Sequence, residues 1–312
     1  MKRSDHANRA GETLYQAWLA ADAEAGPQRA YRLACRLRDP LRQMGRVGAA
    51  RADWALAHTL FWMGRFGEAQ TLLTALRLDV IDPQADAAFG HIGLQLLIPA
   101  QLSWTTALLG DRPTALAHAE SLVTSANSAT PTTHAAYVCH ALGLLHCFLD
   151  MPETCLAWSL RTRIAADCGD PTGLAESARL LEYWAQSRLG VAADEAGVQL
   201  ALASLRRRGP APEARAFSLY AQALYWQAPR HADTQLDSAL DLNARCSLHL
   251  WQARLLHLKS LSLDAAGKLA EAERFLHLAR ETAQRQGAWL FLDPIAGIES
   301  PTFAALHMEF AT

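Results

Sequence analysis

The sequence predicts an all-α protein, and three observations lead to that fold class. Apolar residues recur with helical periodicity along nearly the whole chain, and Gly and Pro fall mostly at the edges of the periodic segments. No stretch of alternating Val, Ile or Thr resembles a strand. Short turn sequences also recur at a stride of about 40 residues, which indicates a repeat array. The expected architecture is therefore a right-handed α-solenoid of about six helical hairpins.

Residues 1–49 are less regular than the rest and are expected to form capping helices. Residues 12–26 and 27–45 each have a helical pattern, and the second helix is expected to be interrupted at Pro40. Two such helices would keep the apolar face of the first hairpin out of water.

Residues 50–292 contain the repeat, in which each unit is an apolar helix, a short turn and a second helix. Side chains seven residues before and five residues after each turn are mostly small, which lets two helices pack about 8–10 Å apart. The fourth and fifth units fit least well, because Tyr183, Glu195 and Asp233 occupy these positions. The turns are centred on Gly64, Gly110, Asp150, Gly190, Ala228 and Gly267, at intervals of 46, 40, 40, 38 and 39 residues.

The stride is lost after residue 292. Residues 293–312 are expected to form a short closing helix or a loosely held end. The chain is thus divided into a cap (1–49), a repeat region (50–292) and a C-terminal tail or cap (293–312).

Composition and charge exclude several classes of function. The formal net charge is −2, with 29 basic and 31 acidic residues mixed along the chain, so no strong field favours nucleic acid or an anionic membrane. No window approaches the roughly 18 uninterrupted apolar residues of a membrane span, and the first residues turn polar where a signal peptide needs an apolar run. The six cysteines lack CxxC spacing, which favours reduced thiols. We expect a cytoplasmic protein with no nucleic-acid or membrane partner.

The stretch HAAYVCHALGLLHC, residues 134–147, raises the question of a metal site. Cys139 and His146 are seven residues apart, as are His140 and Cys147, which separates each pair by roughly 10 Å along a helix. Zinc needs its ligands within about 2.0–2.3 Å, so neither pair can share one ion. We expect these side chains to fill a repeat helix, with no metal or cofactor. The alternative is a helical metalloenzyme or small-ligand site around His140 and Cys147, completed from neighbouring helices.

Other catalytic signatures are absent from the sequence. No GxxxxGK[ST], GxSxG or HExxH motif occurs, and GHIGLQ (90–95) is interpreted as a helix break before Pro99. The run Arg206 to Arg208 closes a helix before Gly209, where cations complement the helix dipole. We therefore expect no catalytic residues.

The layout resembles the tetratricopeptide repeat, whose turn signature is matched by GRFGEA (64–69) and GKLAEA (267–272), although the stride is longer than is usual for that repeat. A narrower resemblance covers residues 50–292. Segments such as RADWALAHTLFWMGRFGEAQTLL and LHLWQARLLHLKSLSLDAAGKLAEAERFLHLARETAQRQGA are similar to the C-terminal helical arm of bacterial class III nucleotide cyclases and related multidomain signalling ATPases. This resemblance implies a regulatory or interaction arm, here without a phosphate loop or a cyclase domain.

The tetratricopeptide resemblance also implies which residues line the concave wall, because first-helix residues do so in such arrays. The selected wall is rich in Trp, Tyr and Arg, the residue types enriched where partners are anchored. The alternative is that longer helices shift the register and several aromatics pack between hairpins. Arg188, Arg215 and Arg254 are not expected in the core. The candidate binding residues are Trp62, Trp104, Tyr137, His140, Trp184, Arg188, Arg215, Trp226, Arg254 and His257.

The expected function is a non-catalytic solenoid that acts as an adaptor or sensor in bacterial signalling. It would bind a peptide, a protein segment or a small effector in its concave groove, through aromatic anchors and Arg–carboxylate pairs. A further expected partner is a separately encoded ATPase or cyclase, with this chain as one arm of a split system.

Overall fold

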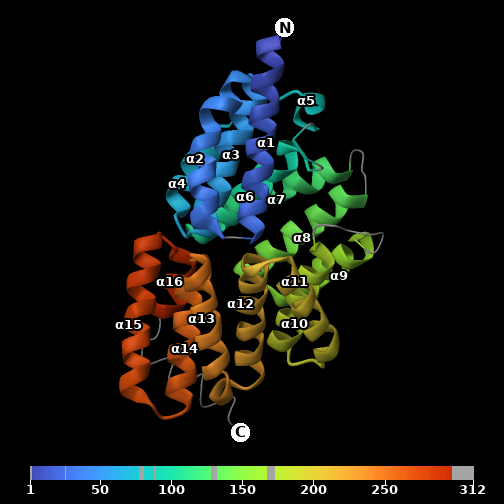
Figure 1. The fold of residues 1–312 in the computed structure, drawn as a ribbon. Helices are drawn as coiled ribbons and strands as arrows, with labels where there is room; N and C mark the ends of the chain where they lie inside the picture. The colour runs from blue at the N-terminus through green and yellow to red at the C-terminus, as the bar shows by residue number, and fades with distance from the viewer. Residues whose placement is uncertain are drawn as a thin grey trace.

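The structure is a computed structural model that describes residues 2–24, 26–76, 81–87, 89–90, 92–127, 132–166 and 173–296. Every regular element in these residues is a helix and none is a strand, so the predicted all-α class is confirmed (Figure 1). Of the predicted C-terminal tail, residues 297–312 lie outside the described residues.

Two helices precede the repeat region and pack against each other: α1 (Lys2–Glu24) and α2 (Pro27–Gln43). The predicted interruption at Pro40 is wrong, because α2 runs through this residue to Gln43. Proline already has a helical φ, and here it removes one backbone donor close to the helix end. Leu37 and Leu41, on either side of it, are fully buried and hold this part of the helix in place.

Consecutive helices then pack as pairs along the chain, and all six predicted turns lie between the two helices of a pair. At five of the six turns the central residue has a positive φ, the left-handed conformation that commonly ends a helix. The exception is Ala228, which is followed by the short 3-10 helix η2 (Pro229–His231). The pairs are α3 (Arg46–Trp62) with α4 (Phe66–Thr74), α6 (Leu94–Leu108) with α7 (Arg112–Asn127), α8 (Thr132–Phe148) with α9 (Pro152–Ala166), α10 (Leu174–Leu189) with α11 (Glu195–Arg208), α12 (Pro210–Gln227) with α13 (Asp233–Cys246), and α14 (Gln252–Ala265) with α15 (Leu269–Gln286), before a final α16 (Trp289–Ala296).

The long first interval of the stride contains an additional helix, α5 (Pro83–Ala87). Arg51 of α3 fixes this connection: its Nε donates to Asp86 Oδ1 at 2.5 Å and its Nη2 to the carbonyl of Ile92 at 3.0 Å. Asp86 Oδ2 in turn accepts from the backbone N–H of Leu94, the first residue of α6. This buried pair therefore has a structural role. The predicted helix break comes before Leu94, and Pro99 lies inside α6.

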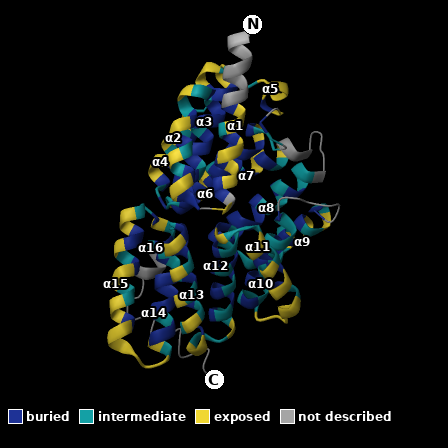
Figure 2. Ribbon diagram, in the orientation of Figure 1, coloured by how far each residue is buried: buried dark blue, intermediate teal, exposed yellow. Residues whose placement is uncertain are grey.

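Burial divides the helices into inner and outer ones (Figure 2). The first helices of the pairs, such as α3 and α6, are buried along most of their length. By contrast, α15 buries four residues, Ala272, Ala279, Thr282 and Ala283, and exposes most of its remaining surface. No helix in the described ranges is long and apolar enough to cross a membrane.

The last helices return to the first ones (Figure 1). Contacts join α12 to α1 and α16 to α6. Arg215 Nη2 donates to Asp22 Oδ2 at 2.9 Å, across 193 residues of sequence, and the backbone N–H of His249 donates to the carbonyl of Trp62 at 2.8 Å. These contacts bring the first and last helices together around the inner face, which forms a partly enclosed cavity.

Candidate functional site

The inward-facing helices enclose a cavity of about 370 Å³. Helices α1, α3, α6, α8, α10, α11 and α12 contribute to its wall, together with the residue before α14. Tryptophan is the commonest aromatic residue in that wall. The aromatic lining residues are Trp18, Trp54, Trp62, Trp104, Tyr137 and Trp251.

Helical spacing places these side chains on the inner face. Trp54, His58 and Trp62 are four residues apart on α3 and therefore lie on one face of that helix. Their rings form a continuous row, with centroids 5.2 Å apart for Trp54 and His58 and 6.2 Å apart for His58 and Trp62. Trp18 of α1 packs edge-on against Trp54 at 5.5 Å. The row gives the cavity a rigid aromatic wall.

Half of the ten candidate residues selected from the sequence lie around this cavity. Trp62, Trp104, Tyr137, His140 and Arg215 are among its lining residues. They come from four different helices, so the fold brings together side chains that are up to 153 residues apart in the sequence.

Asp22 is the centre of one polar cluster in the cavity wall. Arg215 donates to Asp22 Oδ2, and its guanidinium lies 3.9 Å from the ring centre of Trp62. His58 Nε2 lies 3.6 Å from the same carboxylate oxygen. Burial by itself would raise the pKa of Asp22, but the charge of Arg215 and the interaction with His58 outweigh it and hold this pKa well below its usual range. The carboxylate is therefore ionised at neutral pH. We call Asp22, Arg215 and Trp62 the cavity trio.

Three polar atoms near the cavity trio have no hydrogen-bond partner among the described residues: Asp22 Oδ1, Arg215 Nε and Trp54 Nε1. The other indole groups on the same wall differ. Trp18 Nε1 donates to Thr59 Oγ1 at 3.1 Å, and Trp104 Nε1 donates to the carbonyl of Ala141 at 2.8 Å. The indole N–H of Trp54 and the ion pair of Asp22 and Arg215 can therefore each make a further hydrogen bond toward the cavity.

A second arrangement of the same three residue types lies at the α8–α9 turn. Arg188 donates to both carboxylate oxygens of Asp150, at 3.0 and 2.6 Å, and its guanidinium lies 3.9 Å from the ring centre of Trp226. Arg254 is 3.9 Å from the same carboxylate. We call Asp150, Arg188 and Trp226 the turn trio. Arg188 and Trp226 of this trio and the neighbouring Arg254 are three of the remaining candidates, and none of them lines the cavity.

The last two candidates, Trp184 and His257, are buried in the packing between helices and do not line the cavity. Neither ring nitrogen of His257 has a hydrogen-bond partner within the described part of the chain. Burial, followed by the charges of Arg254 and Arg280, lowers the pKa of His257 to about 3. Its imidazole is therefore neutral in the folded protein at physiological pH.

The two residues of the proposed metal alternative are in different environments. His140 lines the cavity, whereas Cys147 is buried outside it, next to the thiol of Cys155. Burial raises the pKa of Cys147 well above its ordinary value, which disfavours the thiolate that binds metals. Within the described part of the chain, no three His, Cys, Asp or Glu side chains come close enough to hold a metal ion.

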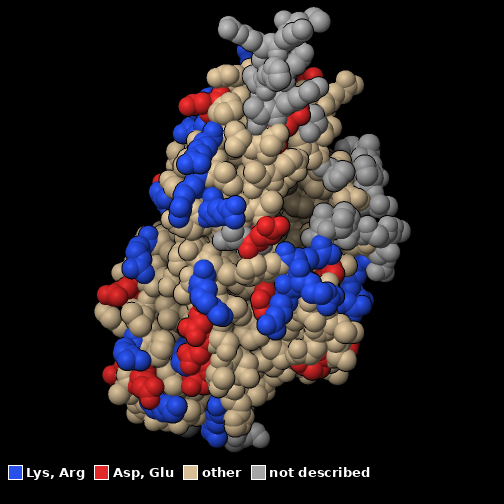
Figure 3. Space-filling model, viewed as in Figure 1, with Lys and Arg blue, Asp and Glu red and all other residues tan. Residues whose placement is uncertain are grey.

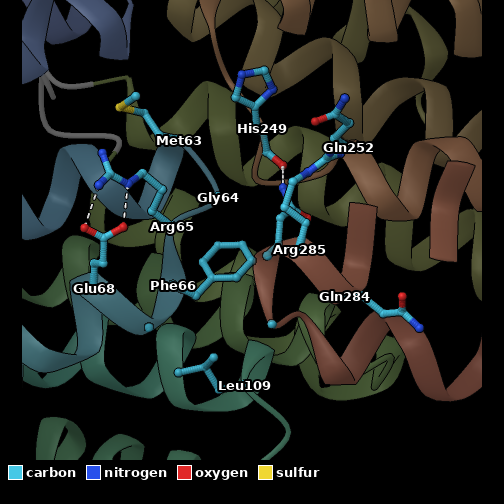
Figure 4. A pocket seen from close by; sticks show the side chains of 13 residues that line it. Met63, Gly64, Arg65, Phe66, Glu68, Leu109, His249, Gln252, Gln284 and Arg285 are labelled. Atoms are coloured by element: carbon cyan, nitrogen blue, oxygen red, sulfur yellow. Dashed lines mark hydrogen bonds and ion pairs between the residues drawn. The ribbon is translucent and has the colours of Figure 1, made fainter. Parts of the chain in front are cut away.

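A second hollow of about 660 Å³ lies where the last hairpin meets the α3–α4 turn (Figure 4). Some of its polar groups pair with one another: Arg65 with Glu68, at 2.6 Å for both bonds, and Gln286 Nε2 with the carbonyl of His249 at 2.7 Å. Gln286 Oε1 has no hydrogen-bond partner among the described residues. The hollow is more open than the cavity and has one aromatic residue, Phe66, besides His249 in its wall, so it is the poorer ligand site.

The surface is also hollowed beside α1, and basic side chains gather nearby over α11 (Figure 3). The last turn of α11 holds Arg206, Arg207 and Arg208. Arg208 lines the cavity and lies 3.4 Å from Glu176, so its charge is balanced by a neighbouring carboxylate.

The candidate list omitted Trp18 and Asp22, because their helix was assigned to a cap. Both lie on one face of α1, four residues apart, and this spacing was visible in the sequence. Their place in the cavity depends on contact between α1 and α12, which no local pattern indicates.

A scan against protein-family models finds no match to this chain, and a search of curated proteins finds none at a significant level. Function is therefore inferred from the geometry and chemistry of the cavity. The cavity offers rigid aromatic area with a few polar groups in its wall, which is the usual composition of a small-molecule site.

Proposed function

We propose that this protein is a non-catalytic binding protein whose cavity holds a small, largely apolar effector. The observation that carries this proposal is the enclosed volume of about 370 Å³ with five tryptophans in its wall. Typical small-molecule sites have volumes of about 300–1,000 Å³ and are mainly apolar with a few placed polar groups. The cavity falls within that range.

Enclosure favours a small effector over an extended peptide. An extended segment of several residues needs a groove open at both ends, and here the contacts between α1 and α12 and between α16 and α6 join the two ends of the helical array. A peptide ligand would therefore present one apolar side chain to the cavity, whereas a small molecule would be surrounded.

The polar groups support binding more than catalysis. Asp22 is ionised and paired with Arg215, and His58 Nε2 accepts the indole N–H of Trp62 at 3.1 Å. Burial raises the pKa of Tyr137 far above neutrality, so its hydroxyl stays protonated. Neither the Asp22 carboxylate nor the Tyr137 hydroxyl exchanges a proton near pH 7.

The wider role in this proposal is that of an adaptor or sensor in bacterial signalling, with a separately encoded ATPase or cyclase as its partner. It is supported by the resemblance of residues 50–292 to the helical arms of signalling cyclases and ATPases. The proposal includes the finer architecture, a right-handed solenoid of about six hairpins with caps at residues 1–49 and 293–312. Its support is that the six repeat turns fall between paired helices.

The test is binding of 1-aminoanthracene, a flat apolar fluorophore that brightens in dry sites. We expect saturable binding at one site with a Kd of about 10 µM, which corresponds to roughly −0.5 kcal/mol per heavy atom. Ala216 is a buried lining residue of α12, so Ala216→Leu should fill part of the cavity and weaken binding about tenfold. Leu200→Ala, at an exposed position on α11, is the control and should change nothing. Binding that is absent, or insensitive to Ala216→Leu, would refute the proposal.

A further inference from the structure

The cavity leaves particular hydrogen-bonding groups without partners, and these groups define a class of ligand. Trp54 is only 6% exposed and Asp22 only 9%, yet Trp54 Nε1 and Asp22 Oδ1 have no partner among the described residues. Buried polar groups in proteins are nearly always paired, so each such exception calls for a ligand or water. Both residues line the cavity, which is the open volume next to them.

The two atoms need opposite kinds of hydrogen-bond partner. An indole N–H can only donate, so Trp54 needs an acceptor, whereas an ionised carboxylate can only accept, so Asp22 needs a donor. Trp18 packs against Trp54 at 5.5 Å, and α1 carries both Trp18 and Asp22 on one face. His58 lies between Trp54 and Asp22, with its ring centre 5.2 Å from that of Trp54 and its Nε2 3.6 Å from Asp22 Oδ2. The unpaired indole N–H and the unpaired carboxylate oxygen therefore belong to the same corner of the cavity wall, beside Arg215 Nε.

The charges of this corner are already balanced. Asp22 Oδ2 pairs with Arg215 at 2.9 Å and lies 3.6 Å from His58 Nε2. A cationic ligand would meet the fixed charge of Arg215, and an anionic ligand would meet that of Asp22, in a site with little water to screen either. An uncharged polar group has no such conflict.

We propose that the effector is a flat, largely apolar molecule with an uncharged amide-like edge, in which an N–H faces Asp22 Oδ1 and a neighbouring C=O faces Trp54 Nε1. The class includes aromatic carboxamides, lactams and imides. The aromatic row on α3 holds the flat body of the ligand, and the amide-like edge sets its orientation. The inference rests on the proposed function, because it assigns the chemistry of the same cavity.

The test uses four naphthalene probes that differ only in the head group, measured by isothermal titration calorimetry at pH 7. They are 2-naphthamide (donor and acceptor), methyl 2-naphthoate (acceptor only), 2-naphthoate (anion) and 2-naphthylmethylammonium (cation). We expect 2-naphthamide to bind tightest, about tenfold better than the ester for the one hydrogen bond gained, and better than either ion. A charged probe that binds as well as the amide, or better, would overturn the inference.

Trp54→Phe keeps an aromatic ring and removes the N–H. This variant should weaken 2-naphthamide and the ester by a similar factor of about ten and leave the cation unchanged. Trp184→Phe is the matched control, because Trp184 is also buried, at 1% exposure, and its Nε1 also lacks an acceptor, but it lies outside the cavity. It should change no probe. Equal losses in the two variants would show that the effect of Trp54 is not local.

The outcomes separate this inference from the proposed function. If all four probes bind with equal affinity, the cavity is a binding site but the proposed amide-like edge is wrong. In that case no ligand group pairs with Trp54 Nε1, and water is its only available partner. If neither these probes nor 1-aminoanthracene binds, both the proposed function and this inference fail.

Discussion

The same combination of Trp, Arg and Asp occurs at two places in this protein, in the cavity trio and in the turn trio. In both, the guanidinium lies 3.9 Å from the centre of a tryptophan ring and donates to a carboxylate. The two tryptophans also occupy the same place in the repeat, since Trp62 and Trp226 each come two residues before a turn centre, Gly64 and Ala228.

The two trios differ in what surrounds the carboxylate. Asp150 has 41% of its side chain exposed and uses both oxygens to bind Arg188, so its pairing is complete. Asp22 is buried, uses one oxygen for Arg215 and leaves the other free beside the cavity. The turn trio is therefore a fully paired contact at the surface, whereas the cavity trio has an unpaired carboxylate oxygen in a mainly apolar wall.

The difference shows why residue type and repeat position do not identify a binding residue. An exposed ion pair contributes little to stability and has water as an alternative partner. A buried one depends on each member, because removing one leaves a charge without solvent or partner. The proposed function rests on the cavity next to the cavity trio.

The sharpest test of this comparison is Arg215→Ala against Arg188→Ala. Arg215→Ala leaves the buried Asp22 without its guanidinium partner and with only His58, 3.6 Å away, so we expect a loss of about 3 kcal/mol in the free energy of unfolding, measured with urea. Arg188→Ala leaves an exposed Asp150 and should cost less than about 1 kcal/mol. In the double variant Asp22→Asn/Arg215→Met the orphaned charge is gone, and most of the loss should be recovered. Equal losses for the two single variants would contradict the distinction between the trios.

Lowering the pH should reduce the free energy of unfolding in two separate ranges, one set by His257, near the turn trio, and one set by Asp22 of the cavity trio. His257, one helical turn from Arg254, has a pKa of about 3 when folded, compared with about 6.5 when unfolded. Between these values only the unfolded chain binds the proton, so stability falls as pH falls, by about 2 kcal/mol between about pH 7 and pH 5. The depressed pKa of Asp22 instead stabilises the fold above about pH 4, and that stabilisation is lost only at lower pH.

The variant His257→Leu tests the contribution of His257 between about pH 7 and pH 5. Its free energy of unfolding, measured with urea, should fall less than that of the parent protein as the pH is lowered, so the difference between the two proteins should grow steadily. A constant difference between the two proteins over that interval would mean that His257 takes up its proton in the folded state.

The smallest expected effect concerns Gly64 and Gly190, the turn residues that come two positions after Trp62 of the cavity trio and Arg188 of the turn trio. Gly64 (φ 74°) and Gly190 (φ 66°) are both left-handed, so Ala at either position should cost about 1 kcal/mol. A Cβ at Gly64 would in addition overlap Gln286 Nε2, which now donates to the carbonyl of His249, whereas a Cβ at Gly190 meets nothing within 4 Å. We expect Gly64→Ala to cost about 1 kcal/mol more than Gly190→Ala, for the hydrogen bond displaced. Equal melting temperatures would show that this contact does not help to close the molecule.

The sequence by itself determined the all-α class and the positions of the six turns. Both are local properties: helical periodicity identifies the helices, and residues that accept a left-handed backbone, such as Gly64 and Asp150, end them. Local rules were less reliable at Pro40, where buried leucines on either side kept α2 continuous.

Only the tertiary structure decided which candidates share a site. Trp62 and Arg215 meet because α12 returns to α1 and α3, and Arg188 is kept apart from them by its pairing with Asp150. These contacts join residues far apart in the sequence, and no periodic pattern encodes the angle at which successive hairpins stack. Contacts between α1 and α12 and between α16 and α6 bring the first and last helices together around the inner face, and the cavity lies there beside Asp22 and Trp54.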